Sequence, residues 1–313
     1  MVGTMRIFGA KNSVLPILAA SLLASGQSVL QNCPDLSDVR LASEILRQLG
    51  CDVRRDGAKI QVDSAHADGI SIPEKLMCEM RSSIIFLGAM TAKNGRALLS
   101  APGGCDLGPR PIDLHLAAFR KMGAEIKEDN GILDCKVNGR LRGAEIHFPF
   151  VSVGATENVL LAAVRAEGVT VIRGAAMEPV IGELCRLLGR MGADISGAGT
   201  PVIRVCGVKR LHDARVTVMP DRIVAGTYLL AAAGSGGRLT IENPPVGQLD
   251  ALLGILRQLE MEVREEKGTL SVVGKPHFPA LPFVQTAEYP GFPTDLQSQL
   301  LAVLLRRKFG KRA

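Results

Sequence analysis

A segment rich in glycine and proline, residues 101–111, holds a cysteine and an arginine whose types and spacing suit acid or nucleophilic chemistry. Cys105 follows two glycines, and Arg110 lies five residues further on. This composition predicts a loop, which is a poor place to bury a thiol, although most free cysteines are core residues. The charge of Arg110 would favour the thiolate, and a loop that closes over a charged substrate suits a proton donor or nucleophile. An incidental exposed thiol is the alternative.

Other polar residues stand where apolar, helix-like runs begin. Lys11 and Asn12 precede the first run, where a lysine could meet an anion at a helix N-terminus. Arg81 opens a second run, and Asp295 opens a later one. A solvated charge explains Lys11 and Arg81 more simply, and an ordinary helix-start acid explains Asp295. The five histidines show no metal-binding spacing and are interpreted as structural or surface residues: His66, His115, His147, His212 and His277.

The cysteines, the charge and one apolar run exclude several classes of protein. Seven cysteines without a CxxC pair argue against a zinc ribbon or a disulfide framework and indicate reduced thiols in the cytoplasm. The net charge is +6, but five basic residues lie within 306–313, and no basic stripe is interleaved with aromatics, so nucleic acid is not an expected partner. The run Val14–Ala24 imitates a secretory signal, yet it is too short for a membrane span, contains Pro16 and recurs along the chain. Neither export nor membrane attachment is expected.

A repeat of about seventy residues defines the elements that must position the candidates. A turn of the form apolar-Gly-x-acid-aliphatic occurs at Leu49–Val53, Met122–Ile126 and Met191–Ile195. A degenerate copy at Leu259–Val263 has Glu260 in place of the glycine. Glycine suits the left-handed residue that ends a helix. The turn therefore predicts a helix end followed by a strand in each copy.

A second marker, a glycine followed by a β-rich stretch, recurs with the same period after each apolar run. These glycines are Gly26, Gly95, Gly168 and Gly237. The runs before them are 13–24, 82–92, 156–165 and 223–233, and a fifth extends from 294 to about 305. Hairpin turns are predicted at Asp56-Gly57, Asn130-Gly131 and Asn138-Gly139. Each unit therefore has the order βαβαββ, with four whole units and the start of a fifth, and the GxGxxG turn of a Rossmann-like sheet is absent.

Seven motifs in one order carry a specific resemblance. They are Gly9–Asn12, Met80–Ser83, Pro102–Cys105, Gly108–His115, Ser152–Asn158, Pro220–Ile223 and Tyr289–Asp295. Together they resemble the UDP-N-acetylglucosamine 1-carboxyvinyltransferase family, from about Met5 to about Leu304. The related shikimate-pathway enolpyruvyl transferases share the repeat fold but lack the Gly-Gly-Cys segment, so this segment favours the sugar-nucleotide branch.

The resemblance implies a fold and a reaction. The fold class is α/β, an inside-out α/β barrel of six βαβαββ units, three in each domain. The reaction moves the enolpyruvyl group of phosphoenolpyruvate onto the 3′-hydroxyl of UDP-N-acetylglucosamine and releases phosphate, the first committed step of peptidoglycan precursor synthesis. The implied partners are these two small-molecule substrates, with no metal, organic cofactor or obligate protein partner. The family is the target of fosfomycin, an epoxide inhibitor.

The resemblance also implies residue roles. Cys105 would protonate the vinyl carbon and form a covalent adduct with phosphoenolpyruvate, and Asp295 would take the proton of the sugar hydroxyl. Lys11, Asn12 and Arg110 would bind phosphoenolpyruvate. The residues implied for the UDP-sugar are Arg81, Arg110, Pro111, Ile112, Asp113, Leu114, Ser152, Val153, Gly154 and Asp295. An acid and a base on opposite sides of a cationic centre, with lysine and arginine around anionic groups, make chemical sense.

Departures from the family pattern lead to expectations about domains and activity. Phe150 stands where lysine is common, and Val180 and Val224 stand where glutamate is frequent. The expected domains are a remnant of the second domain's opening strand (1–10), a first domain of three repeats (11–219), a partial second domain (220–305) and an aberrant basic tail (306–313). Because the repeats stop before the sixth unit, the chain itself is expected to be inactive. The alternatives are a non-catalytic UDP-sugar-binding remnant and an unrelated thiol-dependent regulator, which would leave most motifs unexplained.

Overall fold

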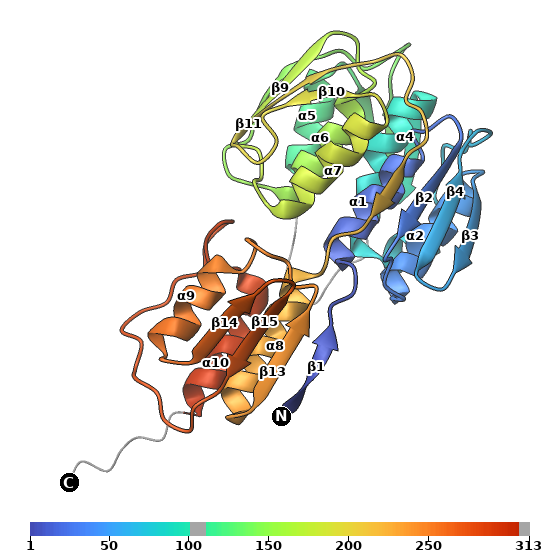
Figure 1. The fold of residues 1–313 in the computed structure, drawn as a ribbon. Coiled ribbons are helices and arrows are strands. Elements are labelled where there is room, and N and C mark those ends of the chain that lie inside the picture. The colour runs from blue at the N-terminus through green and yellow to red at the C-terminus, as the bar shows by residue number, and fades with distance from the viewer. Residues whose placement is uncertain (101–110, 307–313) are drawn as a thin grey trace. The chain divides into compact units, whose positions relative to one another are not determined.

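The chain divides into two compact units (Figure 1). The computed structural model describes residues 1–100 and 111–306, apart from the side chain of Arg81. The large unit is Lys11–Val218, and the small unit combines Met1–Ala10 with the chain from Met219 onward. No helix within the described ranges is both long and apolar enough to cross a bilayer.

The described residues of the large unit form three sheets built on one plan. Their strands are β2 (Gln27–Gln31), β3 (Asp52–Asp56), β4 (Lys59–Asp63), β5 (Arg96–Ser100), β6 (Glu125–Asp129), β7 (Ile132–Lys136), β8 (Glu145–His147), β9 (Val169–Arg173), β10 (Asp194–Ser196), β11 (Val202–Cys206) and β12 (Arg215–Thr217). The sheet orders are β12-β2-β4-β3, β5-β7-β6 and β10-β11-β9-β8. In two of them, a parallel strand joins three antiparallel strands. In the third, a parallel bridge between Ser71 and Leu98 lies beside β5 in place of that strand. Because β12 pairs with β2, the last strand of the unit closes onto the first repeat.

The helices of the large unit lie between its sheets (Figure 1). They are α1 (Lys11–Ser21), α2 (Ser37–Gln48), α3 (Glu74–Glu79), the 3-10 helix η1 (Arg81–Ile85), α4 (Phe86–Asn94), α5 (Asp113–Lys121), α6 (Val153–Ala163) and α7 (Pro179–Arg190). We call α1, α4 and α6 the inner helices, because almost all of their residues are buried: 13–21 in α1, 86–91 in α4 and 155–163 in α6. In contrast, α2 and α7 are amphipathic and bury one face. The predicted inside-out α/β arrangement of βαβαββ units is confirmed.

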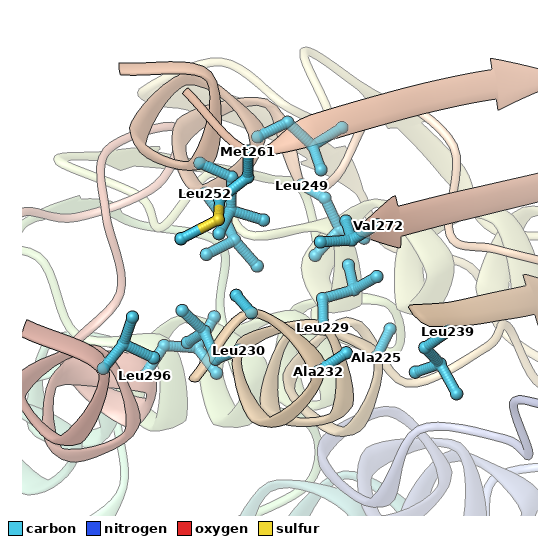
Figure 2. Packing of buried hydrophobic residues seen from close by; sticks show 14 of the residues in the cluster. Ala225, Leu229, Leu230, Ala232, Leu239, Leu249, Leu252, Met261, Val272 and Leu296 are labelled. Atoms are coloured by element: carbon cyan, nitrogen blue, oxygen red, sulfur yellow. The ribbon is translucent and has the colours of Figure 1, made fainter. Parts of the chain in front are cut away.

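In the small unit, the residues up to 306 form one sheet of the same plan. Its elements are β1 (Val2–Arg6), α8 (Arg222–Ser235), β13 (Arg238–Glu242), α9 (Asp250–Gln258), β14 (Glu262–Glu266), β15 (Thr269–Val273), the 3-10 helix η2 (Thr294–Leu296) and α10 (Gln297–Leu305). The sheet order is β1-β13-β15-β14, with β1 parallel to β13. Figure 2 shows the core of this unit, where Leu229 of α8 lies near Val272 of the sheet and Leu249 beside α9.

The repeated turn after a helix requires a left-handed residue, as predicted. Gly50, Gly123 and Gly192 have φ values of 91°, 89° and 101°. Glu260 takes the same place in the degenerate copy with a φ of 55°. A side chain in this conformation is disfavoured by its Cβ atom, so the fourth turn is strained where the other three are relaxed.

Two of the three predicted hairpin turns are confirmed, and the third is wrong. Gly57 lies in the turn between β3 and β4, and Asn130-Gly131 joins β6 to β7 with φ values of 50° and 77°. Asn138-Gly139 follows β7 but leads into a bend rather than into another antiparallel strand. The reason is that β7 already pairs with β5 on one side and β6 on the other, so it offers no free edge.

Candidate functional site

The predicted site residues that the structure describes stand at or just before the first turns of helices. Lys11 and Asn12 begin α1, and Asp295 lies in η2 of the small unit. Five others surround the starts of α5 and α6: Asp113, Leu114, Ser152, Val153 and Gly154. Pro111 and Ile112 directly precede α5, and Arg81 begins η1. Cys105, Arg110 and the side chain of Arg81 lie outside the described residues.

Polar contacts join the start of α1 to the neighbouring helices α2 and α7. Lys11 Nζ lies 2.6 Å from Asp38 Oδ2, in the first turn of α2. Ser13 Oγ donates a hydrogen bond to Glu183 Oε2 of α7, and both side chains are buried. The Lys11 side chain keeps 46% of its exposure, so its ammonium group is accessible while it is held beside Asp38.

The second turn of α6 is joined in the same way to η1, α4 and α5. Asn158 Nδ2 lies 2.9 Å from the Ile84 carbonyl oxygen of η1 and 2.8 Å from His115 Nδ1 of α5. Asn158 Oδ1 accepts a hydrogen bond of 2.7 Å from the Gly88 N–H of α4. On the other side of α6, Thr156 Oγ1 accepts one of 3.1 Å from the Ala176 N–H, just before α7. Together, these contacts bring the first or second turns of α1, α2, α4, α5, α6 and α7 near one another.

This arrangement favours anionic ligands. The backbone N–H groups in the first turns of α1, α2, α5, α6 and α7 have no partners within their helices, and the helix dipoles add partial positive charge there. One of these N–H groups, that of Ala155, donates a hydrogen bond of 3.3 Å to Ser152 Oγ. The residues from Ser152 to Gly154 are half-buried. Phosphate, diphosphate and carboxylate groups are the ligands that such an end binds best.

Two buried ionisable residues lie next to these helix starts. Burial lowers the pKa of His115 to about 4, against the opposing charge of Asp113, so the imidazole is neutral at neutral pH. Burial, and then the charge of Glu178, raise the pKa of Glu157 in α6 to about 8. Sequence reasoning gave neither residue a role. The available signal was the polar pair Glu157-Asn158 inside an otherwise apolar run.

Most of the described cysteines are unsuited to rapid chemistry. Four are buried, and burial raises their pKa values to about 12, 11, 11 and 12 for Cys33, Cys51, Cys135 and Cys185, respectively. Cys78 is exposed, and Cys206 is half-buried with Arg204 Nη1 2.9 Å from its sulfur. Within the described ranges, no three side chains of the metal-binding types come together.

In the small unit, the segment before Asp295 is held by the motif that begins α8. Asp221 Oδ1 accepts hydrogen bonds from the N–H groups of Ile223 and Val224, at 2.8 and 3.0 Å. Arg222 then lies over the Tyr289 ring, 5.6 Å from its centroid. Asp295 is exposed, whereas the next residue, Leu296, is buried in the core. The Pro220–Ile223 and Tyr289–Asp295 motifs are therefore in contact, and Asp295 presents its carboxylate to solvent.

Comparisons with known proteins show which family the chain resembles. A family model described as EPSP synthase (3-phosphoshikimate 1-carboxyvinyltransferase) matches residues 1–307. UDP-N-acetylglucosamine 1-carboxyvinyltransferase 2 from Caldanaerobacter subterraneus subsp. tengcongensis is 48% identical over 97% of this chain and 73% of its own length. UDP-N-acetylglucosamine 1-carboxyvinyltransferase 1 from the same organism is 45% identical over 96% of this chain and 72% of its own. The crystal structure of the enolpyruvyl transferase NikO from Streptomyces tendae matches with a TM-score of 0.88 and 24% identity, over 98% of this chain and 73% of that one, which supports the fold.

Proposed function

The chain belongs to the UDP-N-acetylglucosamine 1-carboxyvinyltransferases, within the EPSP synthase family, and we propose that it transfers the enolpyruvyl group of phosphoenolpyruvate to the 3′-hydroxyl of UDP-N-acetylglucosamine. The products are phosphate and the enolpyruvyl ether of the UDP-sugar. The proposal includes a role in peptidoglycan precursor synthesis and a cytoplasmic location. The described cysteines are all free thiols, which suits that compartment.

The convergence of helix starts in the large unit is the observation that carries the proposal. Both substrates are polyanions, one with a phosphate and a carboxylate and the other with a diphosphate. An end that gathers first turns from several helices supplies N–H donors and positive potential without the cost of burying many lysines. Lys11, which is paired with Asp38, adds an ammonium group at the start of α1, where the phosphate of phosphoenolpyruvate would bind.

The reaction needs one acid and one base, and the proposal assigns both. Cys105 donates a proton to the methylene carbon of phosphoenolpyruvate, which leaves positive charge at C2. The 3′-oxygen of the sugar bonds to C2 while Asp295 takes its proton. Loss of a proton from the new methyl group then restores the double bond as the C2–O bond to phosphate breaks. Opposed acid and base groups of this kind contribute about 10²–10⁴-fold each to such reactions.

The acceptor is proposed to be the UDP-sugar rather than shikimate 3-phosphate. The Gly-Gly-Cys segment at 103–105 and the segments Pro111–Leu114 and Ser152–Gly154 match the sugar-nucleotide branch. In the structure, His115 of α5 and Asn158 of α6, which follow the latter two segments, contact each other. A nucleotide diphosphate would receive backbone N–H groups from both starts.

Phosphate release tests the proposal. Purified protein is mixed with phosphoenolpyruvate and either UDP-N-acetylglucosamine or shikimate 3-phosphate, and phosphate and product mass are measured. We expect release only with UDP-N-acetylglucosamine, and none from Cys105→Ser, a result that would overturn the sequence-based expectation of an inactive chain. Release with shikimate 3-phosphate would contradict the proposed acceptor. Binding of the UDP-sugar without any release would support the alternative, a non-catalytic UDP-sugar-binding protein.

Thiol labelling tests the role of Cys105 separately. An epoxide inhibitor of the fosfomycin type should label Cys105 first, because the four buried thiols have raised pKa values and are protonated at neutral pH. The exposed Cys78 is the internal control for accessibility alone. Peptide mapping that found Cys78 labelled as fast as Cys105 would remove the argument that Cys105 is activated.

A further inference from the structure

Asn158 uses its side-chain amide fully in contacts to three helices. Its two amide N–H bonds are directed to the Ile84 carbonyl oxygen and to His115 Nδ1, at 2.9 and 2.8 Å. Its carbonyl oxygen accepts from the Gly88 N–H at 2.7 Å. The residue is completely buried. Asn158 therefore joins η1 and α4, α5 and its own helix α6 at a single point.

Two glycines allow this close approach. A Cβ atom on Gly88 would lie 2.4 Å from the Asn158 backbone oxygen and 2.9 Å from its Oδ1. A Cβ atom on Gly154, in the first turn of α6, would lie 3.5 Å from Cε1 of the His115 ring. The imidazole thus packs directly against the turn that begins α6, and α4 contacts the next turn of α6 without an intervening side chain.

We propose that His115 and Asn158 are positioning residues, which hold the three segments of the UDP-sugar site, at the starts of η1, α5 and α6, in one fixed arrangement. This inference rests on the proposed function, because that function assigns the three segments to the UDP-sugar. Neither residue needs to touch the substrate. His115 follows Asp113 and Leu114 by less than one helical turn, and Asn158 follows Gly154 by about one turn. Both residues therefore lie next to the first turns of their helices and can hold those turns in place.

The hydrogen-bond roles follow from the chemistry of the two side chains. An asparagine amide nitrogen can only donate, so His115 Nδ1 must accept, and the imidazole proton must lie on Nε2. This requires a neutral ring, which agrees with the pKa lowered to about 4 by burial. A protonated ring would place an N–H against the Asn158 amide N–H, and the contact would be lost.

The first experiment measures local order without any ligand. Amide hydrogen exchange is compared between the 313-residue chain and its variants His115→Leu and His115→Asn. His115→Leu removes the acceptor, whereas the asparagine oxygen in His115→Asn lies near the place of Nδ1. We expect faster exchange at 81–88, 111–116 and 152–158 in His115→Leu, and restored protection in His115→Asn. Equal protection in all three proteins, or no rescue by asparagine, would overturn the inference.

The second experiment measures binding of UDP-N-acetylglucosamine by calorimetry. We expect His115→Leu and Asn158→Asp to weaken binding by about tenfold or more, since each leaves a buried polar group unpaired, and His115→Asn to stay within about threefold. Thr91→Val is the matched control, because it removes another buried polar contact of the large unit, from Thr91 Oγ1 to Cys135 Sγ at 3.6 Å. Equal weakening by Thr91→Val would overturn a specific positioning role. If the wild-type chain binds no UDP-sugar, the proposed function fails, and the exchange experiment still decides whether the pair orders the three segments.

Discussion

Apolar helices of similar composition have different surroundings in the two units. In the large unit, residues 13–21 of α1 and 155–163 of α6 are buried on every side, because three sheets surround them and β12 closes onto β2. In the small unit, α10 packs on α8, and α8 packs on one sheet. Tyr228, Leu301 and Leu305 keep 37%, 54% and 76% of their exposure there. An apolar composition therefore does not by itself decide how deeply a helix is buried. The number of sheets and helices that surround it in its unit decides this.

The largest expected effect separates the chemical roles of the two units. Asp295→Asn, in the small unit, should lower turnover about 10²–10⁴-fold if the carboxylate takes the sugar proton. Binding of UDP-N-acetylglucosamine should change far less, because we assign most of its contacts to the large unit. Steady-state kinetics and calorimetry on the same preparation measure both quantities. Turnover within about threefold of wild type would reduce Asp295 to an ordinary helix-start acid.

A pair of glycine substitutions tests how tightly the helices pack in each unit. Gly88→Ala should destabilise the large unit by about 3 kcal/mol, because the new Cβ would lie 2.4 Å from the Asn158 backbone oxygen, which cannot move away. Gly226→Ala in α8 should cost about 1 kcal/mol, since its Cβ meets the flexible end of Leu296 at 2.6 Å.

Urea unfolding can follow the two units separately. The chain has no tryptophan, and both tyrosines, Tyr228 and Tyr289, lie in the small unit, so tyrosine fluorescence reports on that unit and circular dichroism on both. Gly88→Ala should shift the dichroism transition and leave the fluorescence transition in place. Equal destabilisation by the two substitutions would contradict the difference in packing.

Glu157 should make the stability of the large unit depend on pH. Burial raises its pKa from 4.5 to about 8, so the folded state holds a proton that the unfolded state releases between these values. The contribution of Glu157 to the free energy of unfolding is therefore fully present below pH 4.5 and is lost as the pH rises towards 8. Glu157→Gln, which mimics the neutral acid, should gain on the order of 3 kcal/mol relative to wild type between pH 4.5 and 7. If the free energies of unfolding of wild type and Glu157→Gln differed by the same amount at pH 4.5 and at pH 7, the carboxyl group would not be held neutral.

The smallest expected effect concerns the one strained copy of the repeated turn. Glu260→Gly should stabilise the small unit by about 1 kcal/mol, because glycine accepts the φ of 55° without strain. The exposed contact to Lys275, at 3.8 Å, contributes little. The mirror substitution is Gly123→Glu in the large unit, where a new Cβ atom would have open space within 4 Å and only backbone strain is added. Opposite shifts in the urea midpoint are expected, and shifts of the same sign would contradict this explanation.

Local signals predicted the fold well, because the features that repeat are local. The left-handed turn at Gly50, Gly123 and Gly192 needs only one residue type, and Asn130-Gly131 makes its own hairpin. The hairpin predicted at Asn138-Gly139 is wrong because β7 is the central strand of its sheet and has no free edge. That position is a property of the whole sheet and not of the local sequence.

The site was only partly predictable for the same reason. The motifs indicated which residues stand at helix starts, and the structure places them there. The link between those starts depends on contacts such as Asn158 to Ile84, across 74 residues of sequence, which no local pattern encodes. His115 was accordingly interpreted as structural or surface, although it lies between two of the segments assigned to the UDP-sugar.

Ligand-dependent hydrogen exchange of the 313-residue chain tests the central claim most directly. The chain is incubated with saturating UDP-N-acetylglucosamine or with saturating shikimate 3-phosphate, and exchange is read peptide by peptide. The account predicts that the UDP-sugar slows exchange at 111–115 and 152–158, at the starts of α5 and α6, and that shikimate 3-phosphate does not. Protection of these segments by shikimate 3-phosphate alone, or protection by the UDP-sugar only at other places in the chain, would contradict it.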